Sequence, residues 1–200
     1  MCGLLRPLLI TAVLVPAIGA AQEGDQQRPT QPDPFNYTYV ELGYAETEFD
    51  LAGGGELDGD GFTLSGSIEL TDEWHAYAAY GNADLDFGID LDTWMIGAGY
   101  RYPLRDDTDI YGRLLFVNLE ADVPGPDPDD DGLGLQARLR HRVNDDFEVE
   151  GGIQYLEIDD SDTSLQAEGR YYFQDNFSVG VGLTFGGDSD GIGVSARLSF

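Results

Sequence analysis

The chain contains no lysine, and its ten basic residues, all arginine, stand against 38 aspartates and glutamates, for a formal net charge of −28. Contacts to phosphate groups need exposed cations, so this balance argues against nucleic acid as a partner. Such acidity is typical of a surface kept soluble in high salt, where screening limits repulsion between like charges. Binding of divalent cations is the alternative explanation.

The chain contains one cysteine, Cys2. A single cysteine excludes a disulfide framework.

Long apolar runs are missing too. The longest, Leu8–Ile18, is interrupted by Pro16 and is too short to cross a bilayer as a helix. The sequence therefore offers no transmembrane helix.

The first residues have the pattern of a secretory signal. Arg6 is their one charge, the apolar run follows it, and Gly19-Ala20-Ala21 supplies small residues for cleavage. We therefore interpret residues 1–21 as a signal peptide for export through the Sec pathway. Residues 22–35 are rich in glutamine and proline and lack periodicity, which predicts a flexible lead-in.

Residues 36–200 form a series of short segments in which apolar and polar residues alternate. Aromatic residues make up 12% of the chain and 27 residues are glycine, which favours many short strands over helices. In the first and the fifth segment the alternation of apolar and polar residues is least clear. If two of the weaker segments are not strands, the number is eight instead of ten. The ten predicted strands are 36–49, 60–71, 74–86, 89–103, 109–121, 132–143, 147–159, 162–173, 177–187 and 190–200.

Two kinds of connection alternate between these strands. One is a tight polar turn followed by an apolar residue, as in Asn144-Asp145-Asp146 before Phe147. The other is rich in glycine and aspartate and varies in length, as in Asp122–Gly132. Short periplasmic turns and longer extracellular loops are the asymmetry of transmembrane barrels. An even number of strands then places both termini in the periplasm.

The segment 132–143 indicates which phase faces lipid. One phase is apolar, whereas the other contains Arg138, Arg140 and Arg142. An arginine on the lipid face of a barrel costs about 2–4 kcal/mol at the bilayer midplane, so the arginines must point inward. A soluble sandwich would reverse this arrangement. The predicted fold is all-β: a closed, antiparallel, up-and-down transmembrane β-barrel with acidic extracellular loops.

Charged residues in the inward phase of several strands predict a network that fills the lumen. A three-residue turn at Asn144–Asp146 pairs Arg140 with Glu150 across neighbouring strands, and a turn centred on Asp160 pairs Glu150 with Arg170. Opposite charges that face each other across strands attract. The predicted network contains Arg138, Arg140, Arg142, Glu148, Glu150, Glu168, Arg170 and Arg197.

The final segment, Ile192–Phe200, alternates strictly and ends on an aromatic residue. It resembles the closing strand of bacterial outer-membrane β-barrels, and this resemblance implies that Phe200 is the signal read by the barrel assembly machinery. With Trp94–Tyr102, it makes the region from Asn36 similar to small outer-membrane barrels of the outer membrane protein A and X type. Tyr37–Tyr44 also resembles a group of small exported barrels associated with quorum sensing.

The resemblance implies an integral protein of the bacterial outer membrane, in contact with lipid and lipopolysaccharide, and we expect a monomer without a cofactor. Its function would be non-enzymatic, in a structural or surface-interaction role, and a narrow porin-like channel for small solutes is the alternative. Outer-membrane proteases and acyl-modifying enzymes need an extracellular histidine. The two histidines here, His75 and His141, both lie beside predicted periplasmic turns.

One acidic loop has the beginning of a calcium-binding pattern. Asp127, Asp129 and Asp131 alternate and are followed by Gly132, which gathers the oxygen ligands that Ca²⁺ prefers. The glutamate expected at the twelfth position is replaced by Arg138. A solvated acidic loop is therefore the simpler interpretation, and weak Ca²⁺ binding is the alternative.

Overall fold

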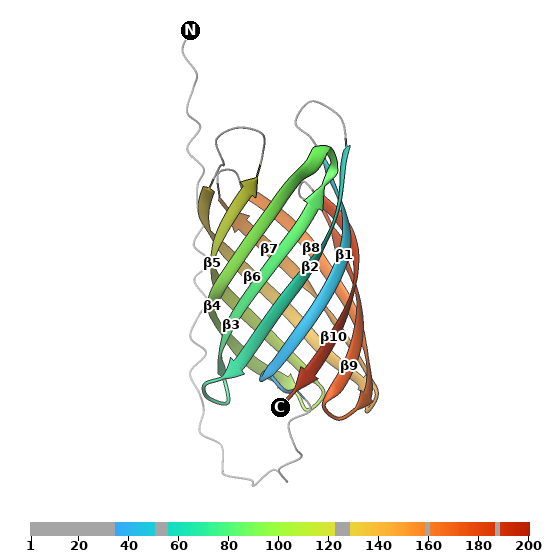
Figure 1. Cartoon of the computed structure of the whole chain (residues 1–200). Helices are drawn as coiled ribbons and strands as arrows, with labels where there is room; N and C mark the ends of the chain where they lie inside the picture. Colours follow the sequence, from blue (N-terminus) through green and yellow to red (C-terminus); the bar gives the residue numbers. More distant parts are fainter. Residues whose placement is uncertain (1–34, 51–55, 123–128, 159–160, 187–188) are drawn as a thin grey trace. The chain divides into compact units, whose positions relative to one another are not determined.

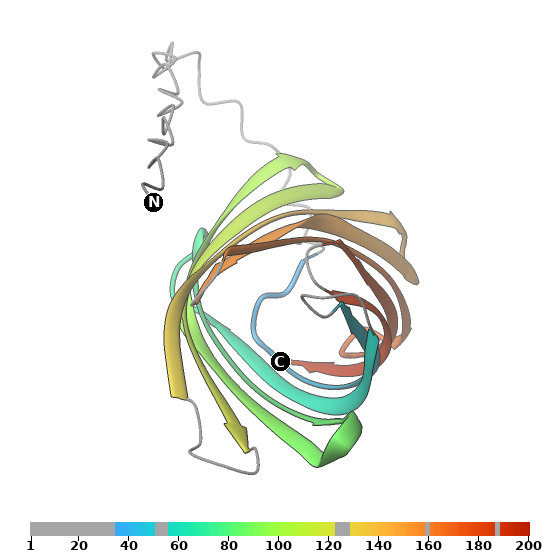
Figure 2. The same cartoon turned by 90° about the horizontal axis from the view of Figure 1, so that it is seen from above.

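The computed structural model describes residues 35–50, 56–122, 129–158, 161–186 and 189–200. These residues form ten antiparallel strands in one sheet that closes on itself (Figure 1), and the view along the axis shows the ring of strands (Figure 2). The predicted signal peptide and residues 22–34 of the lead-in lie outside the described residues. No helix in the described chain is long and apolar enough to span a membrane.

The prediction of ten strands is confirmed, and the strand bounds agree with the predicted ones to within a few residues. One short 3-10 helix, η1 (Asp86–Gly88), connects the third and fourth strands. Gly88 has a φ of 71°, a left-handed conformation that glycine adopts without strain. The strands are β1 (Tyr39–Asp50), β2 (Glu56–Glu69), β3 (Trp74–Leu85), β4 (Ile89–Arg105), β5 (Thr108–Asp122), β6 (Asp129–Asn144), β7 (Phe147–Glu157), β8 (Ser161–Gln174), β9 (Phe177–Phe185) and β10 (Ser189–Ser199).

The barrel closes where β1 pairs with β10, from Tyr39 opposite Ser199 to Phe49 opposite Ser189. Two further hydrogen bonds join the ends of this pair. The backbone N–H of Phe200 donates to the carbonyl of Thr38 at 3.0 Å, and Asn36 Nδ2 donates to the carbonyl of Phe200 at 2.7 Å. Full closure removes unpaired strand edges, which a bilayer does not tolerate.

The strands alternate as the sequence predicts, with apolar side chains outside and polar ones inside. In β6, Leu135 is 52% exposed and Val143 51%, whereas Gln136 is 7% and Arg140 only 2% exposed. A soluble sandwich would bury the leucines and expose the arginines. The observed pattern is therefore that of a barrel whose outer surface meets lipid.

Short turns gather at the end of the barrel where the chain terminates (Figure 1). Between β4 and β5 the turn is shorter than predicted, because β4 continues to Arg105 and β5 already begins at Thr108. Outward-facing aromatic pairs lie near this short-turn end. Trp74 contacts Tyr100 at 5.1 Å between ring centroids, and Tyr171 contacts Phe173 at 4.9 Å. Such rings are typical of the membrane interface.

The predicted register between β7 and β8 is wrong by one step of two residues. Glu150 lies opposite Glu168, and Arg170 lies opposite Glu148 rather than Glu150. A shift of two residues leaves each side chain on the same face of the sheet, so alternation of apolar and polar residues cannot detect it. The register between β6 and β7 is as predicted, with Arg140 opposite Glu150.

The position of Phe200 leads to a prediction about assembly. Its side chain is 71% exposed on the outer surface, beyond the last pair of β10. We expect Phe200→Asp to lower the amount of inserted barrel several-fold, measured as heat-modifiable protein in outer-membrane fractions. Phe185→Asp, at the opposite end of the lipid-facing surface, should insert normally, because an acidic residue near the membrane interface costs only about 0–1 kcal/mol. Equal insertion of both variants would contradict a role for the terminal residue.

Candidate functional site

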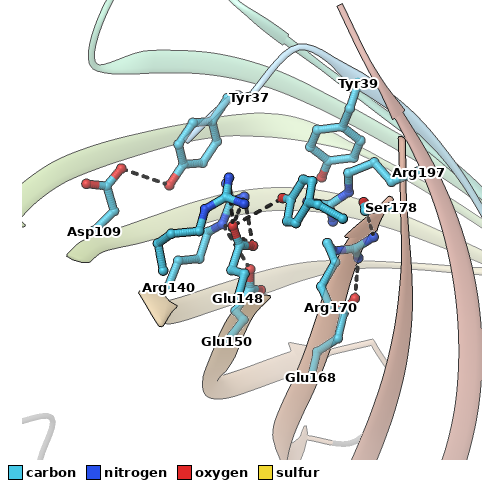
Figure 3. Close-up of polar contacts among 12 residues, drawn as sticks. Tyr37, Tyr39, Asp109, Arg140, Glu148, Glu150, Glu168, Arg170, Ser178 and Arg197 are labelled. Carbon is cyan, nitrogen blue, oxygen red and sulfur yellow. Dashed lines mark hydrogen bonds and ion pairs between the residues drawn. The ribbon is translucent and has the colours of Figure 1, made fainter. Parts of the chain in front are cut away.

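Buried charges cross the lumen in the half of the barrel near the short turns (Figure 3). All eight residues predicted for the lumen network lie there on inward positions, and Glu41 of β1 joins them. We call these nine residues the charge cluster: Glu41, Arg138, Arg140, Arg142, Glu148, Glu150, Glu168, Arg170 and Arg197.

The most deeply buried ion pair joins neighbouring strands β6 and β7. Arg140 Nη2 lies 2.9 Å from Glu148 Oε1, and Arg140 Nε lies 3.1 Å from the same oxygen. Both side chains are 2% exposed. The second carboxylate oxygen of Glu148 accepts a hydrogen bond from the Tyr172 hydroxyl at 3.2 Å and lies 3.8 Å from Arg142 Nη2. Glu148 therefore has charged or hydrogen-bonding partners at both oxygens.

Glu150 is held in a second layer of the cluster. Arg138 Nη1 donates to Glu150 Oε1 at 2.7 Å, and the Tyr111 hydroxyl donates to the same oxygen at 2.7 Å. Arg140 Nε lies 3.5 Å from the other oxygen. Within the described chain Glu150 forms no ion pair with Arg170, as the corrected register requires.

The sequence predicts an ion pair between Glu150 and Arg170. In the structure Arg170 pairs with Glu41 instead. Glu41 Oε2 lies 2.5 Å from Arg170 Nη2 and accepts a hydrogen bond from Arg197 Nε at 2.9 Å. Arg170 also pairs with Glu168. Sequence reasoning missed Glu41 because the phase of β1 was unclear. The available signal was Arg197, which lies directly opposite Glu41 once β10 pairs with β1.

An aromatic layer closes the lumen beside the charges. Phe35 and Tyr37 precede β1 and turn into the barrel, where with Tyr111 they form a buried cluster. The Arg140 guanidinium lies 4.9 Å from the ring centroids of both Phe35 and Tyr37. The Tyr37 hydroxyl donates to Asp109 Oδ2 at 3.5 Å. The end of the predicted lead-in is therefore part of the barrel interior, and β1 begins at Tyr39 rather than at residue 36.

Both histidines lie near the short-turn end. His75 is 1% exposed, stacks on Tyr37 at 4.9 Å, and accepts a hydrogen bond from Arg113 Nε at 3.1 Å. His141 is on the outer surface, where its Nδ1 lies 2.9 Å from the Thr108 hydroxyl. Neither is near the acidic residues of the opposite end.

The predicted calcium loop is only partly described. Asp127 lies outside the described residues, while Asp129 begins β6 and Asp131 accepts a hydrogen bond from Asn118 at 3.1 Å. Among the described residues, no group of three histidine, cysteine, aspartate or glutamate side chains is placed to hold a metal ion.

Charge is distributed unevenly along the barrel axis. Every described arginine lies in the half nearer the short turns, with Arg138 the closest to the middle. Carboxylates occur at both ends. At the opposite end, which we call the long-loop end, six of them have no arginine beside them in the described chain: Glu46, Asp58, Asp60, Asp84, Asp86 and Asp190.

The corrected register predicts which charges depend on each other. Glu148→Ala leaves Arg140 buried without its main partner, so we expect a loss of about 3 kcal/mol or more in the free energy of unfolding. Asp130→Ala, at an exposed position of β6, should change it little. In double-mutant cycles measured by urea unfolding in detergent, Arg140 and Glu148 should couple strongly, whereas Glu150 and Arg170 should be nearly additive. Strong coupling only in the second pair would restore the register first predicted.

Comparison with known proteins agrees with this architecture. A family model described as "Outer membrane protein beta-barrel domain" matches residues 10–185. A comparison with curated proteins gives no match.

Solved structures resemble this chain at low sequence identity, and two of those described here reach a TM-score of 0.50. The KdgM porin in complex with disordered oligogalacturonate is 10% identical with a TM-score of 0.50, and the match covers 81% of this chain and 99% of that one. The β-domain of the Bordetella autotransporter BrkA is 12% identical with a TM-score of 0.50, covering 82% and 99%. Ail, the attachment invasion locus protein of Yersinia pestis, is 16% identical with a TM-score of 0.44, covering 82% and 99%. The family match spans most of the chain, and it confirms the predicted resemblance: this chain belongs to the outer membrane β-barrel protein family and is an integral protein of the outer membrane.

Proposed function

We propose that this protein is a non-enzymatic, non-conducting barrel that anchors an acidic interaction surface in the outer membrane. The observation that supports the proposal is the burial of charged side chains on the inner wall of the barrel. Arg140, Arg170 and Glu148 are each 2% exposed or less, although they lie on the inner wall of a ten-stranded barrel. A ten-stranded barrel is only slightly wider than the eight-stranded type that side chains fill.

The orientation follows from the loops. Short turns of transmembrane barrels are periplasmic and longer loops extracellular, so the short-turn end with Phe200 belongs in the periplasm. Residues 35–38 lie at the same end, next to Phe200, and this supports the proposal that both termini are periplasmic after export through the Sec pathway. We propose that the barrel is a monomer in contact with lipid and lipopolysaccharide, and that the barrel assembly machinery inserts it.

The proposed interaction surface is the long-loop end. The six carboxylates named above have no arginine beside them in the described chain, so the electrostatic field there is negative. A partner would have to supply cationic groups, or divalent cations would have to bridge it to anionic lipopolysaccharide. A catalytic role has little support, because both histidines of the chain lie near the other end. No cofactor is needed for this function.

A narrow channel for small solutes is the second candidate. It is favoured by the space in the long-loop half of the lumen, where a cavity of about 420 Å³ opens toward the loops. Transport would require the charge cluster and the aromatic layer to move apart. Conductance through a planar bilayer separates the two candidates, since only the channel predicts steady openings of the wild-type protein.

The aromatic layer provides the sharpest test of a closed lumen. The double variant Phe35→Ala, Tyr37→Ala removes two buried rings beside Arg140, so we expect it to raise single-channel conductance from near zero to measurable openings. The matched control Tyr171→Ala, Phe173→Ala removes the same two residue types from the outer surface and should stay closed. Steady conductance of the wild type, unchanged in the first variant, would favour the channel and contradict the proposed closure.

A further inference from the structure

The cavity in the long-loop half of the lumen has walls of unequal character. On one side, most inward positions of β2 and β3 carry small residues, including Thr63, Gly81 and Ala83. On the other side, β4, β5 and β7 contribute large apolar side chains to the same cavity: Leu91, Met95, Val117, Leu119 and Leu156. A water-filled pore would carry polar residues at such positions.

The fifth strand, β5, carries apolar side chains on both of its faces. Leu114 and Phe116 face lipid, yet Leu115 and Val117 on the other phase are also apolar and 0% exposed. Apolar residues on both faces explain why the phase of this strand was unclear from the sequence. The inward apolar residues of this strand are buried inside the barrel, and Val117 and Leu119 belong to the wall of the cavity.

The floor of the cavity is polar and is formed by three glutamines above the charge cluster. Gln154 Oε1 accepts hydrogen bonds from Gln136 Nε2 at 2.7 Å and from Gln166 Nε2 at 3.2 Å. Gln154 Nε2 donates none within the described part of the chain. The floor therefore holds a hydrogen-bond donor with no protein acceptor beside the apolar wall.

Charge around the cavity restricts what it can accept. Carboxylates on the outer face of the strands at the long-loop end make the field around that end negative, which disfavours anions. Arg138 at the floor repels cations, and its own charge is already paired with Glu150 at 2.7 Å. Burying any unpaired charge against the apolar wall would be costly. An uncharged molecule meets none of these penalties.

We propose that this cavity is a binding site for a small uncharged amphiphile, with a carbonyl group that accepts from Gln154 Nε2 and an apolar chain along Leu91, Met95 and Leu119. A volume of about 420 Å³ lies within the range of small-molecule pockets. The ligand enters from the long-loop end and stops above the charge cluster. Binding thus requires no passage through the barrel.

Met95 provides a direct probe, because the only other methionine is Met1 in the predicted signal peptide. The experiment uses the protein purified from outer membranes, labelled with ¹³C at the methionine methyl group and reconstituted in phosphatidylcholine nanodiscs. Three probes of equal chain length and different charge are titrated: hexanamide, hexanoate and hexylammonium. We expect a saturable shift of the Met95 methyl signal with hexanamide, and at least tenfold weaker binding of the two charged probes.

Matched variants separate the cavity from the lipid. Leu91→Trp fills the cavity and should reduce hexanamide affinity at least tenfold, whereas Leu135→Trp, the same change on the lipid-facing surface, should leave it unchanged. Gln154→Leu should weaken binding about three- to tenfold, as expected for one hydrogen bond. This variant keeps the test decisive if Leu91→Trp does not fold.

Three results would overturn the proposal. A shift that rises linearly without saturation, or that is equal in Leu91→Trp and Leu135→Trp, would mean that hexanamide only dissolves in the lipid around the barrel. Equal binding of hexanoate or hexylammonium would refute the uncharged class of ligand. Unchanged affinity in Gln154→Leu would refute the role of the glutamine floor.

Discussion

The pairing of buried arginine with buried carboxylate is the constraint on which this barrel depends. An uncompensated charge inside a protein costs several kilocalories per mole, so Arg140 and Glu148 must stay within hydrogen-bonding distance. Because their strands are neighbours, this pair ties β6 to β7. Glu41 does the same at the seam, since it holds Arg197 of the adjacent β10 and Arg170 two strands farther on. The ion pairs of Glu41 thus link closure of the sheet to the pairing of buried charges inside it.

Arginine suits this role better than lysine, which the chain lacks. Its planar group presents several donors in fixed directions, and Arg140 uses this geometry to contact Glu148 through both Nε and Nη2. The same planar group stacks against Phe35 and Tyr37. The guanidinium group therefore contacts a carboxylate and aromatic rings at the same time. The compact ammonium group of a lysine would make only one of these two kinds of contact.

The sequence predicts the fold well because its strongest signal, alternation with a period of two, also determines the fold of a membrane barrel. It places Arg138, Arg140 and Arg142 on the inner face and sets the short turn that pairs them with β7. The prediction from sequence fails where the period of two carries no information. A two-residue shift separates Glu150 from Arg170 without moving either side chain to the other face, and β5, apolar on both faces, conceals the cavity wall. The packing of Phe35 and Tyr37 inside the barrel has no periodic signal at all.

The meeting of the two ends of the barrel region has a topological consequence. Asn36 and Thr38 are hydrogen-bonded to Phe200, so a short linker could join the ends without disturbing the sheet. A circularly permuted chain could then begin and end in one of the connections at the opposite rim. In that chain Phe200 would keep its place beside β1 but would no longer be a terminus. Permutation would therefore separate the two properties that this residue combines, a position in the sheet and the free end of the polypeptide.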